Sequence, residues 1–188
     1  MSSHHIVREK QEPALLILSL DGFDDELLGQ LLEWSPTVMV TVPVAEKLNT
    51  YGIKIDWIIA DEGEEEIQSD VKVLPINNDA LQSAMTFLTD NGYPSVNVVV
   101  DVLNPEDYQP FIDKINLVIF YNDQKIYPIT SGFSKWKPAG EIIEILSVAD
   151  DIQSTGLTAL SAHQFKTTTD GFFTLHFNNP HIFLAENL

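Results

Sequence analysis

Apolar runs alternate with amphipathic stretches over the first two-thirds of the chain. Residues 14–20 form a largely apolar run that ends at Asp21-Gly22, which predicts a buried strand followed by a turn. The run at 96–100 is continuous rather than alternating, as expected of a strand with both faces covered. Other strands are predicted over residues 37–42, 56–60 and 71–74.

Helices are expected between these strands. Asp24 can cap a helix over 25–34, and Asp79 can cap another that ends at Asn91-Gly92. Between them, Pro43 at a first helical position leads a helix to Tyr51. Strands that alternate with helices of this length predict a Rossmann-like α/β domain, with a mostly parallel sheet and helices on both faces.

From about residue 122 the pattern changes to short strands separated by turn clusters, with no helical period between them. Strands are predicted over 126–129, 141–148, 164–168 and 172–177. The chain is therefore expected to comprise a tail (1–12), an α/β domain (13–121) and a small all-β, sandwich-like domain (122–188). A unit this small is expected to rest on the first domain or on another subunit.

The charge balance narrows the range of partners. The net charge is −18, from 28 acids against 10 Lys and Arg, so a polyanion would be repelled and nucleic acid is not an expected partner. Arg8 is the only arginine, and the lack of arginine beyond the tail weighs against a nucleotide enzyme, which uses bidentate phosphate contacts.

Composition also bears on chemistry and compartment. There is no cysteine, which excludes disulfides, thiolate catalysis and cysteine-ligated zinc. No stretch is long and apolar enough to span a bilayer, and the N-terminal residues lack the apolar core of a signal peptide. A cytoplasmic protein without a membrane partner is expected.

A block of acids follows the predicted strand at 56–60 and raises the question of a metal site. Asp61, Glu62 and Glu64 could surround a divalent cation at the strand end. The alternative is a solvated loop whose like charges face water, and this interpretation is favoured because short motifs have many false positives. His163, His176 and His181 match no metal-ligand spacing, so scattered strand histidines are favoured over a metal cluster.

Several segments are shared with a known family. They include Ala14-Leu15-Leu16-Ile17, the segments at 26–36, 52–56 and 92–99, and Lys135-Trp136. With the order of an α/β unit followed by a small β unit, the chain resembles the thiamine pyrophosphokinase family over nearly its whole length. The resemblance implies transfer of a pyrophosphoryl group from ATP to thiamine with Mg²⁺ as the ancestral activity. It also implies a homodimer, since family members place the active site between subunits.

The nucleotide motifs of that family are substituted here. Its second strand ends in Asp-Gly, and the matching place holds Val42-Pro43. Its Gly-Asp-x-Asp-Ser is matched by residues 60–64, in which Asp61 is retained and Gly63 replaces the second acid. Its Asp-x-Asp-x-Thr-Asp is matched by residues 75–80, which bring the uncharged Asn77 and Asn78. Uncharged amides attract Mg²⁺ less strongly than carboxylates.

Two further motifs differ. The family's Gly-Arg-x-Asp-His is matched by residues 104–108, where Pro105 stands in the place of the phosphate-clamping Arg and Asp107 is retained. The Ser-Asn pair that lies near bound thiamine in the family is absent. By resemblance, Asp61 and Asp107 are therefore the candidate cofactor-binding residues, and no catalytic residue is assigned.

Three hypotheses remain open. The leading one is a thiamine pyrophosphokinase-like protein that has lost transfer and binds thiamine or a nucleotide in a binding or regulatory role. The rival is an active, Mg²⁺- and ATP-dependent enzyme with its metal on Asp61, Glu62, Glu64 and Asp79. Such an enzyme would need a cation in place of the missing Arg, for which the candidates are Lys47, Lys54, Lys72 and Lys114. The third is a structural partner of an intact paralogue.

Overall fold

The chain folds into two compact units. The computed structural model describes residues 12–33, 37–61, 71–147 and 151–188. Unit 1 comprises Met1–Leu103 with Asp107–Leu117, and unit 2 comprises Asn104–Glu106 with Val118–Leu188.

Unit 1 is built on a parallel sheet. Its strands run in the order β5-β1-β2-β3-β4, and every pairing among them is parallel. The strands are β1 (Ala14–Ile17), β2 (Val38–Thr41), β3 (Trp57–Ala60), β4 (Lys72–Pro75) and β5 (Ser95–Val100). All four residues of β1 are buried, which is the burial expected of a central strand covered on both faces.

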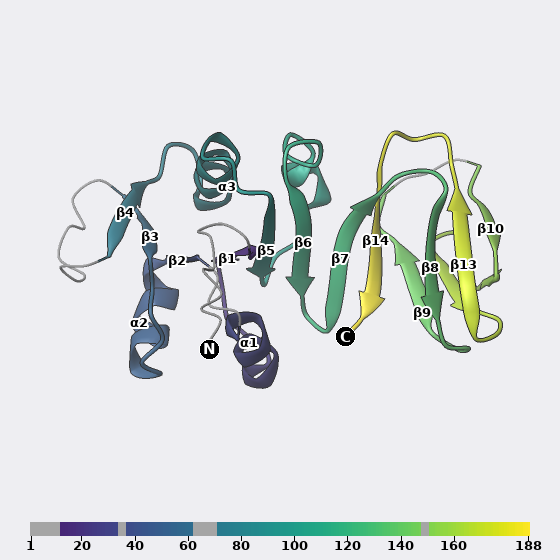
Figure 1. Ribbon diagram of the computed structural model, residues 1–188, viewed down its shortest axis with the longest axis horizontal. Helices are drawn as coiled ribbons and strands as arrows, with labels where there is room; N and C mark the ends of the chain where they lie inside the picture. The colour runs from purple at the N-terminus through teal and green to yellow at the C-terminus, as the bar shows by residue number, and fades with distance from the viewer. Residues whose placement is uncertain (1–11, 34–36, 62–70, 148–150) are drawn as a thin grey trace, which may run out of the picture. The chain divides into compact units, whose positions relative to one another are not determined.

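Helices cover both faces of this sheet. Helix α1 (Asp25–Leu32) and α2 (Val42–Thr50) lie on one side, and α3 (Ala80–Asp90) lies on the other (Figure 1). A short 3₁₀ helix, η1 (Pro105–Tyr108), follows β5. No helix within the described residues is long and apolar enough to cross a membrane.

The predicted capping residues begin two of these helices. The Asp24 carboxylate accepts a hydrogen bond from the Leu27 N–H at 2.8 Å, and Asp79 does the same for Gln82 at 2.8 Å. These carboxylates satisfy N–H groups that have no partner within the helix. Helix α1 ends at Leu32, two residues earlier than predicted, and Trp34 lies outside the described residues.

From Val118 onward, the described part of unit 2 is built of antiparallel strands. One sheet runs in the order β11-β12-β9-β14-β7-β6 and the other in the order β10-β13-β8. The strands are β6 (Asn116–Tyr121), β7 (Gln124–Ile129), β8 (Phe133–Lys137), β9 (Ile142–Ile145), β10 (Gln153–Thr155), β11 (Leu157–Ala159), β12 (Gln164–Thr167), β13 (Gly171–His176) and β14 (Ile182–Asn187). Strand β6 begins in unit 1 and ends in unit 2.

The two sheets of unit 2 share one apolar core. Ile129, Ile143 and Leu184 come from the first sheet, and Phe173 and Leu175 come from the second. Burial of this shared face is what holds a two-sheet arrangement together.

The sequence missed some strands of unit 2. Strands β6, β8, β10, β11 and β14 were not predicted. Strand β9 ends at Ile145, short of the predicted 148, which itself lies outside the described residues. β6 and β7 form a hairpin whose turn contains Asn122 at a φ of 51°. The sequence-based boundary at 121/122 falls in this turn. The mixed α/β class, with a parallel sheet first and antiparallel strands after it, is as predicted.

Candidate functional site

The carboxyl ends of the unit 1 strands form the edge at which an open parallel sheet places its ligand. Five segments meet this edge within the described residues: Leu18 to Asp21 after β1, Thr41 at the end of β2, Asp61 after β3, residues 76–79 after β4 and residues 101–103 after β5. They are tied together by hydrogen bonds. The Thr41 hydroxyl donates to the Leu18 carbonyl at 3.0 Å, and the Ile76 N–H donates to the Ala60 carbonyl at 3.1 Å.

Of the three predicted metal ligands, the structure describes one. Asp61 directly follows β3 and is exposed. Glu62 and Glu64 lie outside the described residues. Within the described residues, no group of three or more His, Asp or Glu side chains is placed to hold a metal ion.

The segment after β4 connects to α3 through local hydrogen bonds. The Asn77 N–H donates to the Ser83 hydroxyl at 3.0 Å, and the Asp79 carboxylate is the N-cap of α3. Asp79 therefore has a structural role, which competes with the metal-binding role that the active-enzyme hypothesis requires of it.

Asp107 lies in η1 and is exposed. Its backbone carbonyl accepts a hydrogen bond at 2.8 Å from the side-chain amide of Gln82, in the first turn of α3. The fold thus brings the Asp107 backbone beside the first turn of α3. Its neighbour Tyr108 is buried, and this burial, with the nearby Asp107 carboxylate, raises the pKa of the Tyr108 phenol far above its usual value.

A pocket of about 400 Å³ opens between β4 and α3. We call it the β4–α3 pocket. Its volume lies in the range of small-molecule sites. It is lined by Leu74, Asn77, Asn78, Gln82, Ser83, Thr86, Phe87, Asp90 and Asn91. Asp90 is the only charged residue in this lining, so the pocket mainly offers amide and hydroxyl groups over an apolar base.

One of the four candidate lysines reaches the carboxyl edge. The Lys47 ammonium donates to the Leu20 carbonyl, after β1, at 3.3 Å. Lys54 instead pairs with Asp56 at 2.9 Å, just before β3, and Lys72 lies 5.0 Å from the Trp57 ring centre at the start of β3 and β4. Lys114 packs over Phe111. Lys114 lies just before Asn116, whose N–H donates a hydrogen bond to the carbonyl of Pro94, the residue that precedes β5. Lys54, Lys72 and Lys114 therefore lie toward the amino ends of the strands.

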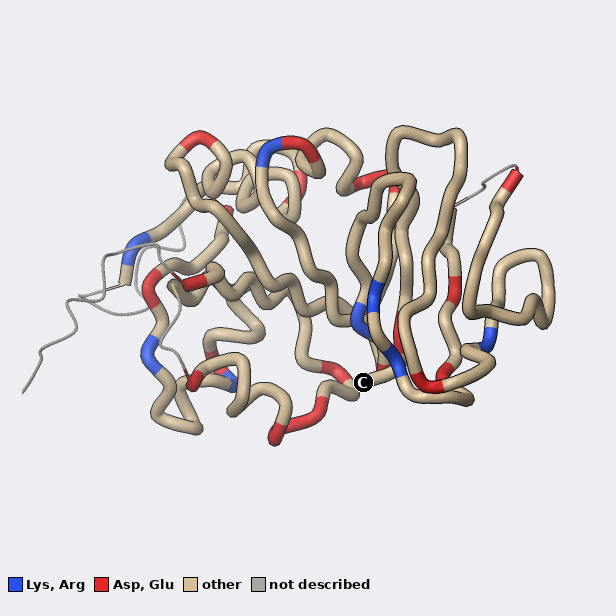
Figure 2. The backbone as a smooth tube through the Cα atoms, turned by 45° about the vertical axis from the view of Figure 1, so that its right-hand side comes forward, with Lys and Arg blue, Asp and Glu red and all other residues tan. Residues whose placement is uncertain are grey.

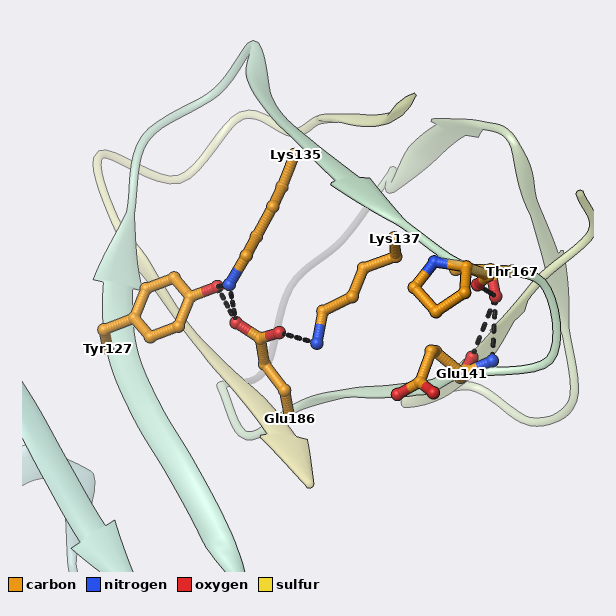
Figure 3. Close-up of polar contacts among 7 residues, drawn as sticks. Tyr127, Lys135, Lys137, Glu141, Thr167 and Glu186 are labelled. Carbon is orange, nitrogen blue, oxygen red and sulfur yellow. Dashed lines mark hydrogen bonds and ion pairs between the residues drawn. The ribbon is translucent and has the colours of Figure 1, made fainter. Parts of the chain in front are cut away.

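Unit 2 contains a charged cluster that the sequence did not single out. We call Tyr127, Lys135, Lys137 and Glu186 the Glu186 cluster (Figure 3). One carboxylate oxygen of Glu186 accepts from Lys135 and from the Tyr127 hydroxyl, and the other accepts from Lys137. Lys135 also donates to the Tyr127 hydroxyl at 3.2 Å. The cluster joins β7 and β14 of one sheet to β8 of the other.

The carboxylate at the centre of the cluster is buried, and the cluster shifts the pKa values of Glu186 and Tyr127. The Glu186 side chain is 4% exposed, Lys137 is 18% exposed and Lys135 is 36% exposed. Burial alone would raise the pKa of Glu186, but hydrogen bonds from Lys135, Lys137 and Tyr127 outweigh it and hold that pKa below its usual value. Burial, with the Glu186 contact, raises the pKa of Tyr127 far above its usual value.

A neighbouring hydrogen-bond network fixes the turn after β8. The buried Thr167 hydroxyl donates to the Pro138 carbonyl at 2.7 Å and accepts from the Glu141 N–H at 2.8 Å (Figure 3). This network ties the backbone that follows Lys137 to Thr167 of β12, and so holds the end of β8 in place.

The pattern of alternation could have revealed the cluster. Phe133, Lys135 and Lys137 occupy alternate positions of β8, and Glu186 ends the otherwise apolar run of β14. Alternate positions share a face, so the same face that buries Phe133 also presents both lysines. The sequence analysis noted Lys135 only as part of a family resemblance.

Within the part of the chain that the structure describes, the histidines and acids do not converge on a metal-binding group. His176 lies on β13, while His163 and His181 lie in the segments before β12 and β14. Figure 2 shows acidic residues scattered along the described chain and few basic ones. The described residues therefore give two places with converging polar groups: the β4–α3 pocket in unit 1 and the Glu186 cluster in unit 2.

Comparison with known proteins adds evidence on the fold. No protein-family model matches the chain, and no curated protein matches it. The structure is similar to thiamin pyrophosphokinase from Candida albicans, with a TM-score of 0.64 and 10% identity, covering 93% of this chain and 90% of that one. It is also similar to the Bacillus subtilis enzyme, with a TM-score of 0.63 and 10% identity over 94% of this chain and 99% of that one.

The yeast enzyme gives a similar result. Its TM-score is 0.63 at 11% identity, with 97% of this chain and 88% of that one covered. Identities this low say nothing about the activity of this chain, because one fold hosts many functions. The chain has the fold of the thiamine pyrophosphokinases.

Proposed function

We propose that this chain is a thiamine pyrophosphokinase-like protein that does not transfer pyrophosphate from ATP to thiamine and instead acts as a binding or regulatory protein. In this proposal unit 1 is the Rossmann-like, nucleotide-side domain and unit 2 is the thiamine-side domain. The protein is a cytoplasmic homodimer, and its ligand is thiamine or a nucleotide. Asp61 and Asp107 are what remains of the cofactor-binding residues.

The observation that carries the proposal is the lining of the β4–α3 pocket. Phosphoryl and pyrophosphoryl transfer depend on metal ions and cationic side chains that neutralise the charge of the phosphates. Asn77 lines the pocket where the resemblance expects a carboxylate, Asn78 beside it is also uncharged, and the next acid, Asp79, caps α3. This edge therefore favours holding a ligand through neutral hydrogen bonds over gripping Mg²⁺ and a triphosphate.

The end of β2 supports the same proposal. Strand β2 ends at Thr41 and α2 begins at Val42, so no loop separates them. Pro43 has no N–H to offer a phosphate, and the Thr41 hydroxyl is bonded to the Leu18 carbonyl. A helix N-terminus that lacks these donors is a weaker anion site.

The alternative function is an active Mg²⁺-dependent thiamine pyrophosphokinase. It is favoured by Lys47, whose ammonium lies at the carboxyl edge beside Leu20 and could take the place of the missing Arg. This enzyme would rely on Asp61 with Glu62 and Glu64 for its metal. The two functions differ in turnover and in the response to Lys47→Met, which would abolish turnover only in the second.

Calorimetry with thiamine and with Mg²⁺-ATP, paired with an assay for thiamine diphosphate, tests the proposal. We expect saturable binding of one of the two ligands and no product. If thiamine diphosphate forms and Lys47→Met abolishes its formation, the alternative function is established. If neither thiamine nor Mg²⁺-ATP binds, both are excluded as the ligand.

A matched variant tests whether uncharged amides in the pocket are the reason for the proposed loss of pyrophosphoryl transfer. Asn77→Asp combined with Asn78→Asp adds negative charge to the pocket without changing its shape, because Asn and Asp are close in size. We expect a higher Mg²⁺ affinity than in the unaltered protein. An unchanged Mg²⁺ affinity would show that the amides are not the cause.

A further inference from the structure

The interior face of unit 2 changes from apolar to charged along two facing strands. On β14, the side chains of Ile182, Leu184 and Glu186 share one face, and the first two belong to the apolar core. On β8, Phe133 packs against the same core, and Lys135 and Lys137 follow on the same face. The core therefore ends in the Glu186 cluster.

Both ammonium groups meet one carboxylate, which leaves an excess of one positive charge. An ammonium group has three donors. The hydrogen bonds found within the described residues use two donors of Lys135 and one of Lys137. Three N–H donors across the two lysines thus remain for another acceptor.

This excess charge is placed where water reaches it only in part. Lys137 is 18% exposed and Lys135 is 36% exposed. A half-buried charge is unfavourable unless a counter-charge balances it, and the Glu186 carboxylate balances only one of the two ammonium charges. A buried ion pair also adds little stability over an apolar replacement. Groups with shifted pKa values, which here include Glu186 and Tyr127, are enriched at functional sites.

The two lysines are held in position. Glu186 separates them by binding each through a different oxygen, and Tyr127 contacts both Glu186 and Lys135 (Figure 3). The Lys135 ammonium also lies 5.2 Å from the centre of the Tyr127 ring. Lys125 is the cross-strand partner of Glu186, so the side chains of the two residues lie on the same face of the sheet.

We propose that Lys135 and Lys137 form a binding site for a single small oxyanion, the carboxylate or phosphate group of a small molecule, with Glu186 and Tyr127 as positioning residues. The strongly negative net charge of −18 favours one small group over a polyanion such as nucleic acid. This site lies wholly in unit 2. It is independent of the proposed function, because it requires neither thiamine nor a nucleotide.

The first test uses the unaltered full chain. Amide chemical shifts are followed by NMR during separate titrations with inorganic phosphate and with acetate, at ionic strength matched with potassium chloride. We expect saturable shifts confined to β8 and the end of β14. The anion that saturates at lower concentration identifies the phosphate or carboxylate class. Shifts that are absent, or that do not saturate, would overturn the proposal.

The second test uses matched variants. Lys135→Met and Lys137→Met each remove one ammonium and leave Glu186 with the other, and Lys166→Met removes an exposed lysine of β12 as the control. We expect anion affinity to fall about tenfold or more in the first two variants and to stay unchanged in the third. Equal affinity in all three would contradict the assignment. If a methionine variant fails to fold, the titration of the unaltered chain decides alone.

Discussion

Glu186 of β14 and Lys137 of β8 form an ion pair that links the two sheets of unit 2, and the carboxylate is almost fully buried. Lys135 binds the other oxygen of the same group. The two ion pairs therefore tie the end of β8 to β14 across the two sheets.

Glu186→Gln should destabilise the protein by about 3 kcal/mol, the lower end of the range for removing one partner of a buried ion pair. The two ammonium groups would lose their counterion, although Lys135 retains much of its hydration. Chemical denaturation measures the change. Glu144→Gln is the control, because its half-buried carboxylate accepts one hydrogen bond from Gln124, and it should cost less than about 1 kcal/mol. Equal losses in the two variants would refute the structural role of the cluster.

The contribution of Glu186 should depend on pH in the acid range. Its folded pKa is lowered, so the ionised group stabilises the fold fully above its unfolded pKa of about 4.3. As pH falls below that value toward the folded pKa, the unfolded chain takes up the proton first and the stabilisation is lost. The free-energy difference between the unaltered protein and Glu186→Gln should therefore narrow below about pH 4.3. A difference that stays constant down to unfolding would contradict the lowered pKa.

Two substitutions at Asp79 separate its capping role from a metal-binding one. Asp79→Ala removes the hydrogen bond to Gln82 and should cost about 1 kcal/mol, while Asp79→Asn should be nearly neutral because Asn caps as well as Asp. Thermal unfolding with and without Mg²⁺ gives the measurement. If Mg²⁺ stabilised the unaltered protein but not Asp79→Asn, Asp79 would be a metal ligand after all.

Gly156→Ala should be strongly destabilising. Gly156 has a φ of +74°, and an added Cβ would lie 2.8 Å from the Phe172 carbonyl oxygen. The left-handed backbone costs about 1–2 kcal/mol and the overlap about 1–3 kcal/mol more. Gly52→Ala is the control, because Gly52 has a φ of +69° with no atom within 4 Å of the added Cβ. Denaturation should show the larger loss at position 156, and equal losses would indicate that the neighbouring strand moves aside.

Much of unit 1 was predictable because its signals are local. The capping carboxylates Asp24 and Asp79 and the apolar run over β5 lie next to the elements they define. The strands β6 and β14 were missed although both are apolar. Their assignment depends on partners far along the chain, such as the pairing of Glu186 with Lys125.

The site was harder to predict than the fold. The sequence indicated Asp61 and Asp107, and the structure places the Asp107 backbone beside Gln82, in the lining of the β4–α3 pocket. The sequence also indicated that Asp79 caps a helix, which the structure confirms. It did not indicate that Lys47 alone of its four candidate lysines reaches the carboxyl edge, or that Lys135 matters. Each of these depends on which groups come within hydrogen-bond distance after folding.

By itself, the sequence determined the class of each unit, the helix starts and the lack of charge at Asn77 and Asn78, because these follow from residue type and local spacing. Only the tertiary structure decided that Glu186, Lys135, Lys137 and Tyr127 meet. They come from three strands and two sheets, and electrostatic interactions weaken steeply with distance and solvent exposure, both of which the packing of the sheets sets.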